Sequence, residues 1–405
     1  MRSLDLKRNL RLLYLFQFLK SLQLFGAVSV PFYLEWGGLD YTRMFVLEGA
    51  FSLFMFVLEV PTGAIADRFG RKWSLVAGAL ASGASFMMFG LVRSYPLFFV
   101  ANFLCAVGAT CISGADRALL YDSLLAAGHG EQGRSVLSRY EAVGSVGMLI
   151  GFPLGSVVAG MPGLHRPASL ALVFFLSGVV FALAALPMLL AREAPRGKVE
   201  KPSLFRDMAE IRLLLAPGQL RRLTCNYALI SATTFFMFWF YQSLAGEAGL
   251  PIAWNGALAA GLNALGMVLL WRAAQLEASL GLARLLFITA IAPGLLYLGL
   301  AWYRPPVLAL PAAFLIVGMR LLRAPLLSDL INKQVESRNR ATVLSGISMI
   351  ERAVTFVFYP LVGLAADRSL SLAFAGLGVC SLLALLLPLR LGQAEQKQVA
   401  AVEYD

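Results

Sequence analysis

The sequence is poor in charge for its length. Of 405 residues, only 14% are Asp, Glu, Lys or Arg, whereas 59% are hydrophobic and the mean hydropathy is +0.74. The interior of a water-soluble protein has no room for so many apolar residues. The scarcity of charge therefore excludes an ordinary water-soluble protein and indicates a chain that lies mostly within a lipid bilayer.

Several kinds of functional site are missing from the sequence as well. The four cysteines fall within apolar runs: Cys105, Cys111, Cys225 and Cys380. The two histidines, His129 and His165, fall between such runs. Neither a disulfide framework nor a metal site is indicated. No GxxxxGK[ST] signature for nucleotide binding is present, and no group of nucleophile, acid and base points to an enzyme. We therefore expect no cofactor.

What the sequence does contain is about twelve long apolar runs. A helix needs roughly 20 mainly apolar residues to span the hydrocarbon layer, and such runs follow one another from 9–34 to 370–389. Strands of a membrane barrel would instead alternate in polarity over about ten residues, and the chain shows no such alternation. The predicted fold class is all-α, an integral membrane protein of about twelve transmembrane helices.

One long polar interruption divides these runs into two groups of six. Residues 1–191 and 219–390 are expected to form an N-terminal and a C-terminal six-helix bundle, with a cytoplasmic tail at 391–405. The linker, 192–218, contains Leu204, Met208, Ile211 and Leu215 on one helical face. This pattern predicts an amphipathic helix that lies in the membrane surface.

The basic residues indicate how the chain is oriented. Most of the 34 Lys and Arg residues fall on the side that holds both termini, and few fall in the opposite loops: Arg43, Arg93, Arg166, Arg304 and Arg368. Cytoplasmic loops carry such an excess of positive charge. We therefore predict a multi-pass protein of the inner membrane with both termini in the cytoplasm. The net charge of +11 reflects orientation and does not indicate a nucleic-acid partner.

An internal repeat relates the two halves. A shift of 207 positions aligns Val136-Leu137-Ser138 with Val343-Leu344-Ser345, and Pro153-Leu154 with Pro360-Leu361. The same shift pairs Asp122 with Asp329. Two homologous bundles are expected of a carrier whose substrate site lies between its halves.

The polar stretch between the second and third runs carries a family resemblance. Gly63-Ala-Ile-Ala-Asp67-Arg68-Phe-Gly70-Arg71-Lys72 resembles the helix 2 to 3 signature of the major facilitator superfamily. Gly63 permits close helix packing, Gly70 supports a tight reversal, and the bases Arg68, Arg71 and Lys72 mark the cytoplasmic side. The resemblance implies that Asp67 docks near the start of helix 11 as a gate latch. The alternative is that the loop only sets topology and packing.

A second resemblance lies in the fifth run. Gly147 and Gly151-Phe-Pro153-Leu-Gly155 resemble the glycine-proline motif of the superfamily's drug:proton antiporters, although such spacing also occurs as plain packing. Those antiporters usually have an arginine in helix 4, and the matching position here is Asn102. The usual assignment of the proton relay therefore fails, and the coupling groups must lie elsewhere.

Ionisable residues inside the spans are the candidates for coupling. Such residues are costly in a bilayer, so each one suggests a function, with a structural ion pair as the alternative. The substrate or proton coupling candidates are Lys20, Glu48, Asp116, Glu141, Arg320, Arg323 and Glu351, and further charges are Glu59, Arg117 and Arg352. Asp116 aligns with Arg323 under the shift of 207, which suggests that the two side chains face each other.

Polar and aromatic residues of the first and seventh runs are the candidates for lining the cavity. They are Gln17, Asn226, Phe235, Trp239 and Gln242. An interfacial aromatic belt is the alternative for the aromatic members.

Together these patterns predict a secondary active transporter that works by alternating access. We expect proton-coupled export of an amphiphilic small molecule by a monomer in the lipid bilayer. The alternatives are an uptake system or a carrier of lipid-like or anionic solutes with other coupling, and a transport-inactive receptor or scaffold.

Overall fold

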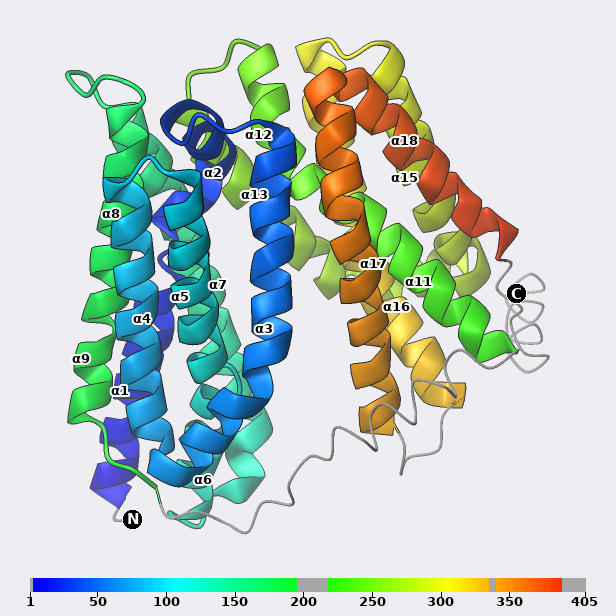
Figure 1. Ribbon diagram of the computed structural model, residues 1–405. Coiled ribbons are helices and arrows are strands. Elements are labelled where there is room, and N and C mark those ends of the chain that lie inside the picture. Colours follow the sequence, from blue (N-terminus) through cyan, green and yellow to red (C-terminus); the bar gives the residue numbers. More distant parts are fainter. Residues whose placement is uncertain (1–2, 195–217, 335–339, 388–405) are drawn as a thin grey trace. The chain divides into compact units, whose positions relative to one another are not determined.

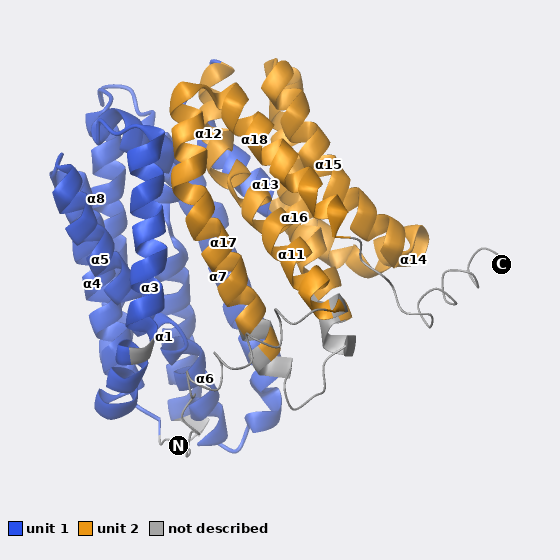
Figure 2. Ribbon diagram, turned by 45° about the vertical axis from the view of Figure 1, so that its right-hand side comes forward, with its two compact units in different colours: residues 1–200, 249–263 blue, residues 201–248, 264–405 orange. Residues whose placement is uncertain are grey.

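The computed structural model describes residues 3–194, 218–334 and 340–387 of the chain. Within these ranges every regular element is a helix (Figure 1), which confirms the predicted all-α fold class. The expected linker helix at 204–215 and the expected tail at 391–405 lie outside the described residues. The chain divides into two compact units, residues 1–200 with 249–263 and residues 201–248 with 264–405 (Figure 2).

Unit 1 contains the helices of the N-terminal half. In chain order they are α1 (Ser3–Ser21), η1 (Leu24–Ala27), α2 (Ser29–Pro31), η2 (Phe32–Trp36), α3 (Tyr41–Phe69), α4 (Arg71–Leu91), α5 (Tyr95–Ile112), α6 (Ala115–Leu125), η3 (Gly130–Gln132), α7 (Gly133–Ala159), α8 (Ala168–Leu183) and α9 (Ala185–Leu190). The buried side chains at the centre of the unit include Leu13, Phe16, Leu75 and Leu119.

Unit 2 contains most of the helices that follow the linker. They are α11 (Gln219–Phe235), α12 (Met237–Glu247), α13 (Trp254–Trp271), α14 (Ala273–Leu280), α15 (Leu282–Trp302), α16 (Pro306–Gln334), α17 (Arg340–Arg368), α18 (Leu370–Leu383) and η4 (Ala384–Leu386). The first half of α13 belongs to unit 1. Leu223, Leu286, Leu327 and Val343 are among the buried core residues of unit 2.

The described helices agree with the predicted order of membrane spans. Ten of them are long and apolar enough to cross a membrane. An eleventh span results if Asp5–Ala27 and Ser29–Trp36, bent by 60°, are taken together. In the position of the last predicted run, Leu370–Leu386 is apolar but shorter. The first predicted run is therefore not one straight helix, since it breaks where the glycines of α7 approach its backbone.

Small residues bring the helices of unit 1 close together. A Cβ atom added to Gly178 on α8 would lie 2.6 Å from the carbonyl oxygen of Gly83 on α4. On the other side of α4, a Cβ atom at Gly78 would lie 2.8 Å from the carbonyl oxygen of Gly108 on α5. Lipid tails are as apolar as leucine, so close backbone packing of this kind is a main source of helix association in membranes.

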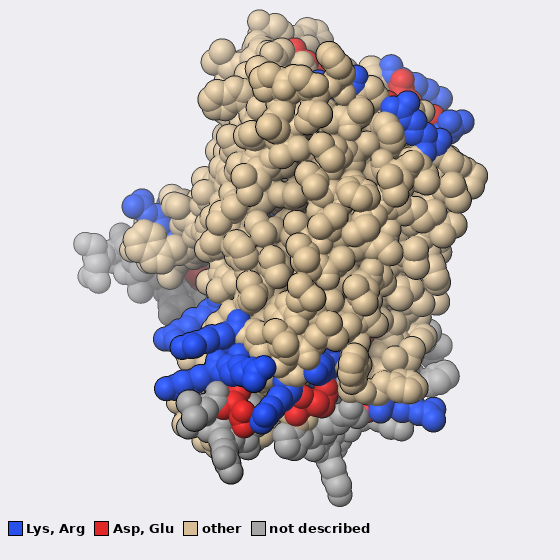
Figure 3. Space-filling model, turned by 90° about the vertical axis from the view of Figure 1, so that its left-hand side faces the viewer, with Lys and Arg blue, Asp and Glu red and all other residues tan. Residues whose placement is uncertain are grey.

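The outer surface has the distribution of charge that a membrane requires. Figure 3 shows charged side chains gathered towards the two ends of one face, with a broad uncharged band between them. Large apolar side chains on α4, α8 and α9 are exposed, among them Leu80, Leu183 and Leu186. The hydrocarbon layer would cover such a band.

Candidate functional site

An ion pair joins α1 to α6 inside unit 1. The Lys20 ammonium nitrogen lies 2.5 Å from a carboxylate oxygen of Asp116, and the Tyr140 hydroxyl donates to the same oxygen at 2.9 Å. The two charged side chains are only 19% and 7% exposed. The ammonium also lies near the faces of the Phe16 and Tyr140 rings. A base, an acid and a hydroxyl donor therefore meet at one buried point.

Glu48 on α3 is a second acid inside unit 1. It is half-buried, and no Lys or Arg of the described chain lies within ion-pair distance of it. Its carboxyl group hydrogen-bonds with the Tyr33 hydroxyl and lies near the Cys105 thiol. Among the described residues, the partner of this carboxyl group is therefore a hydroxyl group and not a base.

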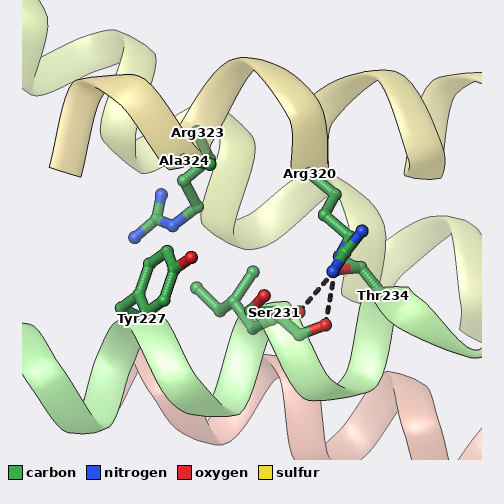
Figure 4. Close-up of a pocket in the computed structure, with 7 residues that line it drawn as sticks. Tyr227, Ser231, Thr234, Arg320, Arg323 and Ala324 are labelled. Atoms are coloured by element: carbon green, nitrogen blue, oxygen red, sulfur yellow. Dashed lines mark hydrogen bonds between the residues drawn. The ribbon is translucent and has the colours of Figure 1, made fainter. Parts of the chain in front are cut away.

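Unit 2 also contains an acid and base pair within its spans. Arg320 on α16 has one guanidinium nitrogen 3.7 Å from a carboxylate oxygen of Glu351 on α17. Ser231 on α11 donates its hydroxyl to the same carboxylate oxygen. The Arg320 guanidinium also lies 5.3 Å from the centre of the Phe235 ring. Arg320 and Ser231 line a small pocket between α11 and α16 (Figure 4).

Asp116 and Arg323, which the repeat suggested as facing partners, each have hydrogen-bond partners within their own unit. Asp116 bonds to Lys20 and Tyr140 within unit 1. Arg323, which is 3% exposed, donates to the Asn226 side-chain oxygen at 2.5 Å within unit 2. It also donates to the Leu286 carbonyl oxygen at 2.5 Å and the Thr289 hydroxyl at 2.8 Å. The aligned positions each fasten their own bundle, because a buried charge binds the nearest complementary groups.

Glu141 is placed differently from the other coupling candidates. Its carboxylate lies 2.9 Å from the Arg117 guanidinium, and the two side chains are 47% and 62% exposed. An exposed ion pair of this kind contributes little to stability. Glu141 and Arg117 therefore form a surface pair on unit 1.

The glycine and basic residues of the signature loop have distinct positions. Gly70 lies between α3 and α4 with a φ of +112°, a backbone conformation that suits glycine. Gly281, between α14 and α15, has a φ of +77° at the corresponding place in unit 2. Asp67 and Arg68 are exposed on the last turn of α3. A Cβ atom at Gly63 would meet no atom within 4 Å, so this glycine does not provide the expected close packing within unit 1.

Two acids of unit 1, Asp122 and Glu193, hold the loop in place, and neither role was evident from the sequence. The guanidinium of the buried Arg71 forms an ion pair with Asp122 on α6. The Glu193 carboxylate accepts from the backbone N–H groups of Arg71 and Lys72 at 2.9 and 2.8 Å. The Lys72 ammonium donates to the Leu189 carbonyl oxygen at 2.8 Å. A carboxylate at the start of α4 is favoured by the helix dipole.

The glycines of the fifth run bring α7 against the end of α1 and the residues that follow it. A Cβ atom at Gly147 would lie 2.9 Å from the Phe18 carbonyl oxygen, and one at Gly151 would lie 2.9 Å from the Gln23 backbone nitrogen. A Cβ atom at Gly155 would overlap the backbone of Leu24. Pro153 lies in the same helix and is half-buried. The expected close helix contact is therefore present.

The same end of α7 also holds the first turn of α13. The Ser156 hydroxyl donates to the Ala253 carbonyl oxygen at 3.0 Å and accepts from the Gly256 backbone N–H at 3.0 Å. A Cβ atom at Gly256 would lie 2.5 Å from the Cα atom of Pro153. This contact explains why residues 249–263 group with unit 1.

The predicted cavity-lining residues have varied surroundings. Gln17 is buried on α1 beside Gly144 of α7. Asn226 binds Arg323 and the Ala384 carbonyl oxygen and so has a role in packing. Phe235 packs edge-on against Tyr359 and lies near Arg320. Trp239 is half-buried and Gln242 is buried, both on α12.

Comparison with known proteins identifies relatives of the chain. The family model of the Major Facilitator Superfamily matches residues 21–359. The chain is 25% identical over 206 residues to a human chromaffin granule amine transporter, covering 51% of this chain and 38% of that protein. It is 26% identical over 165 residues to multidrug resistance protein 2 of Bacillus subtilis, covering 41% and 39%. The matches thus span about two fifths of the length of these relatives.

Solved structures with the same arrangement of helices are transporters. A crystal structure of the nucleoside transporter NupG has a TM-score of 0.75 at 13% identity, covering 94% of this chain and 98% of that chain. A bacterial homolog to the human lysosomal transporter Spinster, in an inward-facing and unoccupied conformation, has a TM-score of 0.72 at 16% identity, covering 95% and 94%. At these identities the similarity shows the fold alone.

Proposed function

Because this chain belongs to the major facilitator superfamily, and is therefore a multi-pass membrane transporter and not an enzyme, we propose that it exports an amphiphilic small molecule in exchange for protons. The similarity to a multidrug resistance protein supports export. The excess of basic residues on the side of both termini supports insertion in a cytoplasmic membrane with those termini inside. A monomer contains both bundles and both buried acid and base pairs.

The buried Lys20 and Asp116 pair is the observation that carries this proposal. A proton bound to Asp116 cancels its charge and so weakens its attraction for Lys20. The Tyr140 hydroxyl and the Lys20 ammonium are then free to change partners. Since the pair joins α1 to α6 within unit 1, one proton can alter how these helices are held together. Glu48, which lacks a cationic partner in the described chain, is the second candidate for carrying a proton.

Transport by reconstituted vesicles under an imposed pH gradient tests the proposal. We would use three naphthalene compounds with the same ring system, naphthalene-2-sulfonate, 2-naphthyltrimethylammonium and methyl 2-naphthyl sulfone. At least one is expected to accumulate against its gradient, and a protonophore should abolish this accumulation. Asp116→Asn should abolish it as well, because the amide no longer exchanges a proton. Glu131→Gln, an exposed position before α7, is the control and should retain it.

The proposal fails if transport ignores the pH gradient and Asp116→Asn, Glu48→Gln and Glu351→Gln all leave it intact. Uptake or another coupling ion would then be favoured. Asn102, at the position of the usual antiporter arginine, supports this alternative, since it donates to the Leu47 carbonyl oxygen at 2.5 Å and thus fastens α5 to α3. A receptor or scaffold would be favoured if no vesicle transports any compound while the protein remains functional in cells.

We also propose that the loop of Gly63, Asp67, Arg68, Gly70, Arg71 and Lys72 gates the cytoplasmic side. Its anchoring by Asp122 and Glu193 supports this role, because a latch needs a fixed position in its own bundle. A cysteine in place of Asp67, cross-linked to a cysteine at the start of α17, should stop transport until the cross-link is reduced. Continued transport by the cross-linked protein would show that the loop serves only topology and packing.

A further inference from the structure

Unit 2 contains a buried cation, Arg323, that has no carboxylate partner among the described residues. Arg323 is 3% exposed, and among the described residues its guanidinium bonds only to neutral oxygens, those of Asn226, Leu286 and Thr289. Its Nε atom is buried and has no hydrogen-bond partner within the described chain. A charge taken out of water normally acquires a counter-charge, and leaving it without one is costly. Packing alone does not explain why an arginine occupies this position.

A second arginine, Arg320, lies about one helical turn before Arg323 on α16. Arg320 and Arg323 both line the pocket between α11 and α16, and Figure 4 shows them opposite Tyr227, Ser231 and Thr234. The Arg320 Nε atom is also buried and has no hydrogen-bond partner among the described residues. Glu351 is the carboxylate within ion-pair distance of this group in the described chain. Among the described residues, the two arginines therefore have a single carboxylate within ion-pair distance, that of Glu351 beside Arg320.

Glu351 makes the contacts that a bound anion would make here. It accepts from the Ser231 hydroxyl, hydrogen-bonds with Tyr227 and lies beside the Arg320 guanidinium. Its 3.7 Å separation from Arg320 is longer than a hydrogen bond, so this pair is loose. A guanidinium binds carboxylate, sulfonate and phosphate oxygens through several N–H groups at once. An anion with better geometry can therefore replace Glu351.

We infer that this pocket of unit 2 binds the anionic head group of an organic solute, with Arg320 as its direct contact and Arg323 supplying buried positive charge. The pocket has room for about one water molecule, so the head group can enter only where Glu351 gives up its place beside Arg320. The ring of Phe235, which lies beside Arg320 and packs edge-on against the buried Tyr359, offers an apolar surface for the rest of the molecule. This inference rests on the proposed transport function and makes its substrate an amphiphilic acid.

Calorimetric titration of the protein in nanodiscs, with no pH gradient, tests the inference. Naphthalene-2-sulfonate is the probe, and 2-naphthyltrimethylammonium and methyl 2-naphthyl sulfone are the matched cationic and neutral compounds. The sulfonate should bind with saturation and more tightly than the other two. Arg320→Gln should weaken its binding about tenfold or more, because a charge-assisted hydrogen bond is lost. Arg320→Lys should restore part of the affinity.

Glu351→Gln gives a result that a purely structural role would not produce. It removes the competing carboxylate, so the sulfonate should bind more tightly than to the unmodified protein. Arg304→Gln, at the far end of unit 2 where Arg304 binds Glu247, is the control and should leave the affinity unchanged. A cooperative thermal unfolding transition, measured for each variant in the absence of the sulfonate, shows that the variant is folded. Equal binding of sulfonate and sulfone, or an affinity that neither Arg320→Gln nor Glu351→Gln changes, would overturn the inference.

This binding test separates the inference from the proposed function. The sulfonate could bind with the expected variant effects while transport ignores the pH gradient. That pair of results would refute proton coupling and leave the anion site in place. Proton-driven export of the ammonium compound, without sulfonate binding, would refute the anion site alone.

Discussion

Gly155→Val is expected to unfold or severely destabilise the protein. A Cβ atom at this position overlaps the backbone of Leu24, so α7 must move away from the chain at the end of α1. Rotation of a side chain cannot remove this overlap, because the overlapping atoms belong to the Leu24 backbone. Overpacking costs about 1–3 kcal/mol where side chains can adjust, and we expect a larger loss here. The melting temperature in nanodiscs and the yield of monodisperse protein measure it.

Gly63→Ala is the matched control for this substitution. Gly63 also lies inside a helix, but a Cβ atom there meets nothing within 4 Å. Alanine is favoured over glycine in a helix by about 1 kcal/mol, so the melting temperature should stay equal or rise. A similar loss of stability in both variants would show that the contact between α7 and the segment after α1 is not what makes Gly155 necessary.

Arg71→Met is expected to have the second-largest effect. It removes the Arg71 guanidinium from the Asp122 carboxylate in a buried ion pair, since both side chains are only 10% exposed. Breaking a buried ion pair by removing one partner costs about 3–5 kcal/mol. The backbone N–H of Arg71, which donates to Glu193, is unaffected by the substitution. A loss of melting temperature therefore reports the ion pair and not the helix cap.

The double variant Arg71→Met with Asp122→Leu separates the two possible causes. An apolar pair of similar volume removes the unpaired charge, so most of the lost stability should return. If the double variant is as unstable as the single one, the guanidinium must be needed for its shape and not for its charge.

The overall fold was predictable because the bilayer imposes a simple rule on the sequence. Apolar runs of about 20 residues must become helices there. The tight reversal at Gly70 was also predictable, since glycine between two spans indicates a positive φ. The break after α1 was not, because it depends on how close the glycines of α7 come, and nothing in the run 9–34 specifies its neighbour.

The partners of the charged residues were harder to predict. The repeat aligns Asp116 with Arg323, yet Asp116 binds Lys20, and Arg323 binds Asn226. A repeat fixes the position of a residue in its own bundle but not which side chain its charge meets. Glu193 was overlooked because it follows the last span of the first half, where an acid has no periodic pattern to distinguish it.

The hydrogen bonds of Ser156 have a consequence for any attempt to divide the protein. If the polypeptide were cut between residues 195 and 217, the first fragment would lack Ala253 and Gly256, which Ser156 holds at the end of α7. The second fragment would carry these residues without the surface that orders them. We therefore expect each piece to be more stable when both are produced in the same cell than when either is produced alone.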